Sequence, residues 1–358
     1  MEQIYREYVK STRISVGVDL HKKHWAVTIM DRSELVKKYH IPGTWEALKK
    51  TLIPYAPAEV TVCYEAGYFG YWLHDEVEKW GGQCAVIAPS LIPQASGNRV
   101  KTDPKDSFKL AHLLSKELLK PIYVPAADKR AERQLLRTRT DFVEDRHRVQ
   151  CRIKSFLTLN GIEAPEDRDW SVAFVEKLKS LRMPHPLEHY CLAAYLKQYE
   201  DLKELIKGVD QQLRQLAKSE RYQNSVALLK SAPGIGTLTA MEFLLEIEDI
   251  HRFTSGERLA AYIGLTPSQY SSGEHTRLGR ITKGGKSHLR GTLVEAAWSA
   301  IRQDQNLKTK YERIKMRAGA KRAIVAIARN VVVRLRVLLL TQQKYQYPEE
   351  PNTLNDAA

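Results

Sequence analysis

Four carboxylates in the early part of the chain are of the kind that binds divalent cations: Asp19, Glu65, Asp103 and Asp106. Asp19 lies inside a β-branched run, where a buried carboxylate is costly unless a cation or hydrogen-bond donors compensate it. Glu65 directly follows a second such run. Four oxygen donors suit Mg²⁺ or Mn²⁺, and two such ions can support phosphoryl transfer by holding the attacking and leaving oxygens.

Asp103 and Asp106 begin a helical pattern. Together with Leu110 and Leu113 they follow one another at spacings of three, four and three, which puts all four on one helix face. Pro104 suits the first helical position, with Asp103 before it as the N-cap. Two carboxylates about 4 Å apart repel by roughly 4 kcal/mol at an effective dielectric of 20, so a cation between them would be favoured. The alternative is that both acids only cap the helix and complement its dipole.

Two histidines close to the first acid, His21 and His24, could also be taken for metal ligands. Because no further histidine cluster lies near them in the sequence, a solvated turn is the better interpretation. Glu65 taken alone could likewise be an exposed turn acid. A metal site follows only if the four acids meet, as they would at the carboxyl ends of strands in an open sheet.

The first 125 residues show the pattern of such a sheet. β-branched runs predict strands over 14–20, 25–30, 34–40, 59–64 and 84–88, and apolar periodicity predicts helices over 45–52 and 69–80. Three strands in a row, followed by alternating helix and strand, predict a mixed sheet with a parallel part. We therefore expect an α/β domain.

Charge and cysteine usage set the class of protein. The chain has 358 residues and a formal net charge of +14, which predicts two or three domains and a polyanionic partner. Its four cysteines have neither zinc spacing nor the density of a disulfide framework, so we expect a reducing cytoplasm. The most apolar late stretch, 323–340, contains three arginines, which predicts a buried or amphipathic helix and no membrane span.

The middle of the chain is helical in pattern. Over 129–159, apolar residues recur every seven positions, while arginines crowd the other faces: Arg133, Arg137, Arg139, Arg146, Arg148 and Arg152. These arginines either form a solvated face or contact a nucleic-acid backbone. Over 192–216, four heptads of apolar a and d positions predict a coiled coil. It could pack on the preceding helix or form a subunit contact.

A glycine-containing segment, 228–238, has the form of a helix-hairpin-helix turn. Gly234 and Gly236 would let the backbone turn tightly, and the amides of the next helix could hold a phosphate. The alternative is an ordinary glycine-rich connection between helices. In so basic a protein we favour the phosphate contact.

A second basic segment, 277–286, is interrupted by glycines and has no apolar period, so we predict an exposed loop that grips phosphates. The candidate phosphate-binding residues are Arg277, Arg280, Lys283 and Lys286. The preceding Ser272-Gly273 step would normally be only a turn. Helices are predicted over 287–301, 307–316 and 320–340.

Residues 17–19, 64–67 and 101–106 resemble the Asp-Glu-Asp-Asp signature of RuvC-like transposases with a ribonuclease H fold. The family is the one numbered one-ten among bacterial insertion sequences, which includes Piv-type invertases and bridge-RNA-guided recombinases. Residues 270–273 and 279–284 resemble its second conserved block. The resemblance runs over about 14–340.

The resemblance implies a DNA transposase or site-specific recombinase with Asp19, Glu65, Asp103 and Asp106 as metal-binding tetrad and Ser272 as nucleophile. Spacing alone does not separate Ser272 from Ser271. It further implies Mg²⁺ or Mn²⁺ as cofactor, DNA as substrate, a structured non-coding guide RNA, a homo-oligomer and action at the bacterial nucleoid.

We therefore expect an RNase H-like catalytic domain over 1–125, a helical coiled-coil linker over 126–222, a mainly α C-terminal domain carrying Ser272 over 223–341, and a disordered tail over 342–358. Two alternatives stay open. One is a RuvC-like junction resolvase that uses water as nucleophile, and the other is a non-catalytic architectural protein that binds nucleic acid.

Overall fold

The structure is a computed structural model that describes residues 13–93, 103–166, 170–272, 275–282 and 284–347, and it forms two compact units, 1–125 and 126–358. The elements of the first unit are β1 (Ile14–Leu20), β2 (His24–Asp31), β3 (Glu34–Pro42), α2 (Trp45–Leu52), β4 (Val60–Glu65), α3 (Trp72–Trp80), β5 (Gln83–Ile87) and α4 (Asp103–Ser115). The side chains of residue 104 and of 269–278 are not described, nor is that of residue 103.

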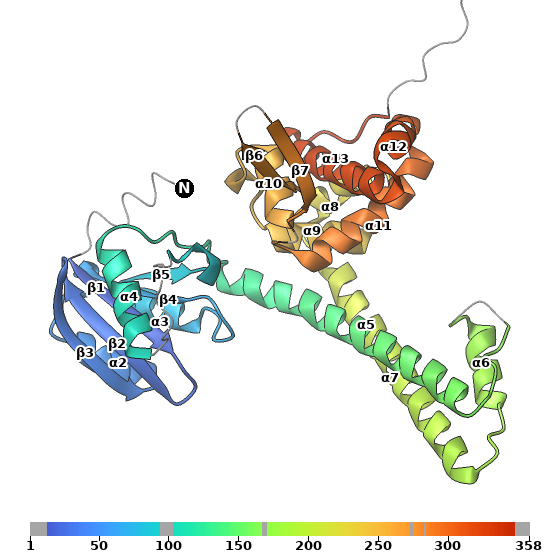
Figure 1. Ribbon diagram of the computed structural model, residues 1–358, viewed down its shortest axis with the longest axis horizontal. Coiled ribbons are helices and arrows are strands. Elements are labelled where there is room, and N and C mark those ends of the chain that lie inside the picture. The colour runs from blue at the N-terminus through green and yellow to red at the C-terminus, as the bar shows by residue number, and fades with distance from the viewer. Residues whose placement is uncertain (1–12, 94–102, 167–169, 273–274, 283, 348–358) are drawn as a thin grey trace, which may run out of the picture. The chain divides into compact units, whose positions relative to one another are not determined.

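The first unit is a five-stranded mixed sheet in the order β3-β2-β1-β4-β5 (Figure 1). β1 pairs antiparallel with β2 and parallel with β4, and β4 pairs parallel with β5. The predicted mixed sheet with a parallel part is thereby confirmed. The predicted helix over 69–80 is three residues too long at its start, because α3 begins at Trp72.

The two faces of this sheet bury different helices. Alternate residues of β1 and β4, such as Val16 and Val62, pack with α2 and α3 in the larger core. The residues between them face α4: Cys63 of β4 shares a second core with Leu110 and Leu114 of α4. Because side chains alternate along a strand, each position of β1 and β4 is assigned to one face.

The second unit is mostly helical, as predicted for the C-terminal part. Its elements are α5 (Ala127–Leu159), α6 (Val172–Ser180), α7 (Pro186–Leu216), α8 (Gln223–Lys230), α9 (Thr237–Ile247), α10 (Gly256–Ile263), β6 (Pro267–Ser272), β7 (His275–Ile281), α11 (Ser287–Gln303), α12 (Gln305–Ala318) and α13 (Ala320–Thr341). α5 and α7 lie side by side, and α6 packs at the far end of this pair (Figure 1). The heptad positions of α7 face this contact, with Leu192, Tyr199 and Leu202 buried among residues of α5 and α6.

Two predictions about this unit are wrong. The segment predicted as a loop, 277–286, begins inside β7, which pairs antiparallel with β6 as a two-stranded hairpin. The tail predicted to be disordered from residue 342 is described through Tyr347, because Tyr345 is held to the body of the unit. Its hydroxyl donates to Asp304 and its amide donates to Ser231 Oγ at 2.8 Å. The rest of the predicted tail lies outside the described residues.

Candidate active site and nucleic-acid interface

Asp19 and Glu65 lie at the carboxyl ends of the neighbouring parallel strands β1 and β4. The register pairs Val18 with Tyr64, so positions 19 and 65 are the next pair along. Both positions alternate with residues of the larger core and therefore belong to the face that α4 covers. Both acids are half-buried, with the Asp19 side chain 22% exposed. The sheet thus brings together two of the four predicted acids.

α4 approaches this pair of acids from above the sheet. A Cβ at Gly17 would stand less than 3.0 Å from the Ser107 carbonyl oxygen and the Ala111 amide nitrogen, so glycine permits close contact of helix and strand. The buried hydroxyls of Ser107 and Thr28 also hydrogen-bond at 3.0 Å. Lys116, just past the end of α4, donates to Ser33 Oγ at 2.9 Å, beside the amino end of β1. α4 therefore runs antiparallel to β1, and its first turn lies toward Asp19.

Positions 103 and 106 occupy that first turn. Position 103 lies one turn before buried Ser107, and position 106 one turn before buried Leu110. α4 begins at Asp103, one residue earlier than predicted, and the side chain of Asp103 is outside the described part. Among the described side chains, no group of three or more His, Cys, Asp or Glu residues is arranged to hold a metal ion.

The donors at this edge of the sheet fit a hard divalent cation. Asp19 and Glu65 are carboxylates on one face, and the α4 register directs positions 103 and 106 toward them. His21, predicted to be in a solvated turn, is 51% exposed, and its Nε2 lies 3.2 Å from Asp19 Oδ2. No pattern in the sequence indicates this contact beyond the spacing of two residues. The contact between His21 and Asp19 places an imidazole beside the first acid.

Ser272 is the last residue of β6, and the hairpin register pairs it with His275 of β7. The predicted phosphate-binding residues lie along β7 and just beyond it. Arg280 is exposed, whereas the side chain of Arg277 and residue Lys283 lie outside the described part. Ser272 therefore stands at the tip of a strand pair whose second strand and following segment are basic.

Hydrogen bonds and close backbone contacts hold the base of this hairpin, where an exposed loop was predicted. Arg290 Nη1 donates to the carbonyl oxygens of Ile263 and Gly284, each at 3.0 Å. Gly264 and Gly285 both have positive φ, and a Cβ on either would stand less than 3.0 Å from backbone of the other segment. The end of α10 and the segment after β7 are therefore in close backbone contact at the base of the hairpin.

Two buried acids of α9 hold side chains just before and inside α11. Lys286 Nζ lies 2.7 Å from Glu246 Oε2, so Lys286 is an anchored cation with a partner already in place. His288 Nδ1 lies 2.6 Å from Glu242 Oε1, and this hydrogen bond raises the pKa of His288. The sequence signal for these two contacts, which the sequence analysis did not use, is a pair of acids four residues apart in a mostly apolar helix.

The glycines of the predicted helix-hairpin-helix turn have different surroundings. Gly234 packs against α11, where a Cβ would stand less than 3.0 Å from the Ala296 carbonyl oxygen, and its amide donates to Gln303 Oε1 at 3.3 Å. Gly236 is the N-cap of α9 and has open space at its Cβ position. The turn thus serves as a packed helix connection at Gly234, while Gly236 remains accessible.

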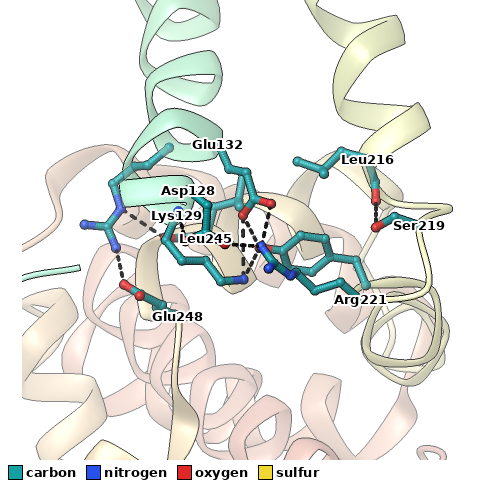
Figure 2. A network of polar contacts seen from close by, with 10 residues as sticks. Asp128, Lys129, Glu132, Leu216, Ser219, Arg221, Leu245 and Glu248 are labelled. Carbon is teal, nitrogen blue, oxygen red and sulfur yellow. Dashed lines mark hydrogen bonds and ion pairs between the residues drawn. The ribbon is translucent and has the colours of Figure 1, made fainter. Parts of the chain in front are cut away.

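The arginines of α5 do not form one solvated face. Arg133 is 6% exposed; its Nε donates to the Leu245 carbonyl oxygen at 3.0 Å and its Nη2 to Glu248 at 3.4 Å (Figure 2). Arg139 pairs with Asp210 of α7. The prediction that these arginines are solvated or contact nucleic acid is wrong for Arg133, because the first turns of α5 are part of the packed body of the second unit.

A polar network fixes the start of α5 to the turn between α7 and α8 (Figure 2). Arg221 Nη1 lies 2.7 Å from Asp128 and 3.0 Å from Glu132. Lys129 Nζ donates to Tyr222 Oη at 2.6 Å and also lies over the Tyr222 ring. Burial raises the pKa of Tyr222, and its hydroxyl donates to Glu132.

Comparisons with known proteins find two transposase family models along the chain. Residues 16–161 match a family model described as Transposase, the DEDD model of IS110 proteins, and residues 226–312 match one described as Transposase IS116/IS110/IS902 family. The chain carries the domains of an IS110-family transposase. The first match spans Asp19, Glu65, Asp103 and Asp106, and the second spans Ser272.

Matches to curated relatives cover different shares of the chain. It is 34% identical to the putative transposase y4qE of Sinorhizobium fredii over 67% of this chain, and the match spans 58% of that relative. It is 27% identical to the transposase for insertion sequence element IS1533 of Leptospira borgpetersenii over 90% of this chain and 94% of the relative. It is 28% identical to the transposase for IS1111A of Coxiella burnetii over 73% of this chain and 72% of the relative.

Helices that could cross a membrane were also sought. In the described ranges, no helix has both the length and the apolar composition that a membrane span needs.

Proposed function

We propose that this IS110-family chain is the transposase of an insertion sequence, which cleaves DNA and rejoins it at new positions. The observation that carries the proposal is the register that aligns Asp19 with Glu65 on the sheet face beneath the first turn of α4. The strand order β3-β2-β1-β4-β5, in which β2 alone runs antiparallel to the other four strands, is consistent with an RNase H-like fold. On these two observations we assign the metal-dependent half of the proposed active site to the first unit.

For the rest of the chain we propose the architecture that the same family resemblance implies. The α5–α7 pair would be the coiled-coil linker over 126–222, and residues 223–341 would be the transposase domain with its helix-hairpin-helix-like turn. The packing of α5 and α7 within the chain supports the linker assignment. The hydrogen bonds of Tyr345 to Ser231 and Asp304 support a C-terminal domain that ends later than predicted.

Asp19, Glu65, Asp103 and Asp106 are the residues that would hold Mg²⁺ or Mn²⁺. A divalent cation bound there supplies charge neutralisation at the scissile phosphate and favours the deprotonated form of an attacking hydroxyl. The acids themselves bind and orient, and Gly17 keeps α4 close enough for its first turn to take part. His21 holds its ring against Asp19 and so restricts that carboxylate.

The proposed nucleophile is the Ser272 hydroxyl. Its oxygen forms a bond to phosphorus as the bond from phosphorus to the 3′ oxygen breaks; the serine proton passes to solvent, and the leaving oxygen takes up a proton to become a free 3′-hydroxyl. The strand is then held as a phosphoserine ester. Because the ester conserves the phosphodiester energy, rejoining to a new 3′-hydroxyl needs no energy cofactor.

The acids belong to the first unit and Ser272 to the second. We infer that the two halves meet only in an assembly on DNA, in which a homodimer or homotetramer supplies acids and serine from the same or different subunits. The family resemblance adds a structured non-coding guide RNA that would choose donor and target sites. The net charge of +14 supports polyanionic partners of this kind.

A denaturing gel tests the function. The substrate is a labelled plasmid fragment with the coding region and its flanking non-coding DNA, supplied with RNA transcribed from that flank and Mg²⁺. We expect a DNA–protein adduct with the wild-type chain, no adduct with Ser272→Ala, and neither adduct nor cleavage with Asp103→Asn. DNA binding by Asp103→Asn should stay within about threefold of wild type, since a neutral isostere changes little at a distance.

Other outcomes of the same gel would select the alternatives. Free cleaved ends with both wild type and Ser272→Ala would indicate a resolvase-type nuclease that uses water. Binding without cleavage or adduct would indicate an architectural protein. Full activity of Asp103→Asn would contradict the metal tetrad.

A further inference from the structure

The positive charge of the chain is concentrated near its C-terminal end. From Arg302 to Lys344 there are twelve Lys and Arg residues and two acids, Asp304 and Glu312, and no Asp or Glu occurs between Glu312 and Glu349. The chain as a whole carries 56 basic and 42 acidic residues, so this stretch accounts for most of the +14. Such an excess is larger than solubility requires and marks a surface for polyanions.

The structure places the centre of this charge on a helix–turn–helix corner. α12 and α13 pack against each other (Figure 1), and the chain turns between them at Gly319, whose φ of +82° favours glycine. Arg313 and Arg317 are exposed one turn apart on α12, and Lys321 and Arg322 are exposed in the first turn of α13. We call these four residues the α12–α13 basic surface.

Neighbouring charges are already used within the fold. Lys315 pairs with Glu312 at 3.2 Å, Lys310 donates to Asn330 at 3.0 Å, and Arg334 pairs with buried Asp304 at 3.1 Å. The part of the chain that the structure describes offers no carboxylate to the four residues of the α12–α13 basic surface. All four residues are exposed, and no ion pair of the described residues compensates their charge.

The composition of the surface distinguishes between forms of nucleic acid. Proteins that bind single strands stack bases on exposed aromatic rings, and residues 313–322 contain no aromatic residue. Arginine and lysine without such rings suit the phosphates of a duplex, whose bases are already stacked. We propose that the α12–α13 basic surface binds the phosphate backbone of double-helical nucleic acid.

The four residues of this surface lie outside both family matches and outside the candidate active site. The family match ends at residue 312, and the hairpin that carries Ser272 lies earlier in the chain. The proposal rests on the proposed function, since it gives the transposase a second grip on its nucleic acid in addition to the β6–β7 segment. Backbone contacts there would add affinity and orientation without sequence preference.

The test measures binding of the full-length chain to random-sequence duplex DNA and, separately, to duplex RNA over a range of salt concentrations. The variant is Arg313→Gln/Arg317→Gln/Lys321→Gln/Arg322→Gln. Each lost phosphate contact lowers the slope of log K against log salt by about 0.9 on duplex DNA, so four contacts predict a decrease of about 3 to 4. Affinity near 0.1 M salt should fall by about tenfold or more.

A matched control removes the same charge elsewhere: Lys197→Gln/Lys203→Gln/Lys207→Gln/Arg214→Gln on α7. That helix carries four basic and five acidic residues, and Lys197 and Arg214 already face Asp201 and Asp210. We expect the salt slope of this control to change by less than about one. An equal change in both variants would overturn the proposal, because it would reflect net charge alone.

Each remaining outcome of the binding test either supports or overturns the proposal. A slope change confined to the DNA arm or to the RNA arm supports the proposal and identifies which duplex is bound, whereas no change in either arm overturns it. If the fourfold variant does not fold, the pairs Arg313→Gln/Arg317→Gln and Lys321→Gln/Arg322→Gln should each lower the slope by about 2. Because this assay needs no cleavage, it stays decisive even if the adduct predicted for Ser272 is not found.

Discussion

The candidate metal site depends on Gly17, whose side chain is a single hydrogen atom and therefore allows close contact with α4. Gly17 precedes Asp19 by two residues on the same face of β1, and it is the position where the backbone of α4 touches the sheet. Any larger side chain would separate helix and strand, and with them Asp106 and Asp19. The family signature begins at this glycine, and the structure supplies the physical reason.

We predict that Gly17→Ala costs about 1–3 kcal/mol in free energy of unfolding, as overpacking of a close contact usually does. It should also abolish DNA cleavage, because α4 must move away from the acids. Urea unfolding of the full chain, with hydrogen exchange of β1 peptides, measures the first effect. Gly67→Ala is the control, since a Cβ there meets nothing within 4 Å; equal effects of the two substitutions would disprove the close-contact explanation.

His288 gives a prediction on pH. The hydrogen bond to Glu242 raises its pKa above the ordinary 6.5, Glu144 adds to the rise, and burial and Arg139 oppose it. Protonated His288 therefore stabilises the folded state below about pH 6.5, and that contribution is lost as the pH rises through the raised pKa. Glu242→Gln should lower the His288 pKa, as followed by NMR of the imidazole protons. An unchanged pKa would show that the carboxylate does not control this histidine.

At the scale of elements, the first turns of α5 belong to the C-terminal helical body. Arg133 is enclosed with the Leu245 carbonyl and Glu248, and the network around Glu132 and Tyr222 fixes the other side of the helix (Figure 2). The long α5–α7 pair is therefore rigidly continued into the body that carries the β6–β7 hairpin.

Replacing Arg133 tests this continuity. Arg133→Ala should destabilise the second unit by about 3–5 kcal/mol, because it leaves a buried carboxylate without its cation. Arg137→Ala, one turn along the same helix and exposed, should cost less than about 0.5 kcal/mol. Denaturant unfolding of the two variants compares them directly. Similar costs at both positions would mean that Arg133 is not the structural arginine.

Elements with a strong local period were predictable, and those set by distant partners were not. β1 and α2 match their predicted ranges, since β-branched alternation and helical periodicity are local signals. The segment 277–286 was predicted to be a loop although it begins inside β7, because glycines and basic residues hide the alternation of that strand. Arg133 and Lys286 were taken for surface cations because their carboxylate partners lie more than 35 residues away in the sequence.

At the scale of the whole molecule, the chain divides its chemistry between two units. Asp19 and Glu65 are placed by the sheet of the first, and Ser272 by a hairpin in the second. Strand context and helical spacing in the sequence suggested the acids, whereas the role of Ser272 was suggested only by resemblance to a family, because a Ser-Gly step is normally just a turn.

The most direct measurement of this account maps the amino acid that becomes linked to DNA. The Mg²⁺-dependent adduct is digested with nuclease and protease, and mass spectrometry locates the nucleotide that remains on the peptide. We predict a phosphoester on Ser272 with the wild-type chain and no modified peptide with Asp19→Asn. A nucleotide on Ser271 or another residue, or an unchanged yield with Asp19→Asn, would contradict it.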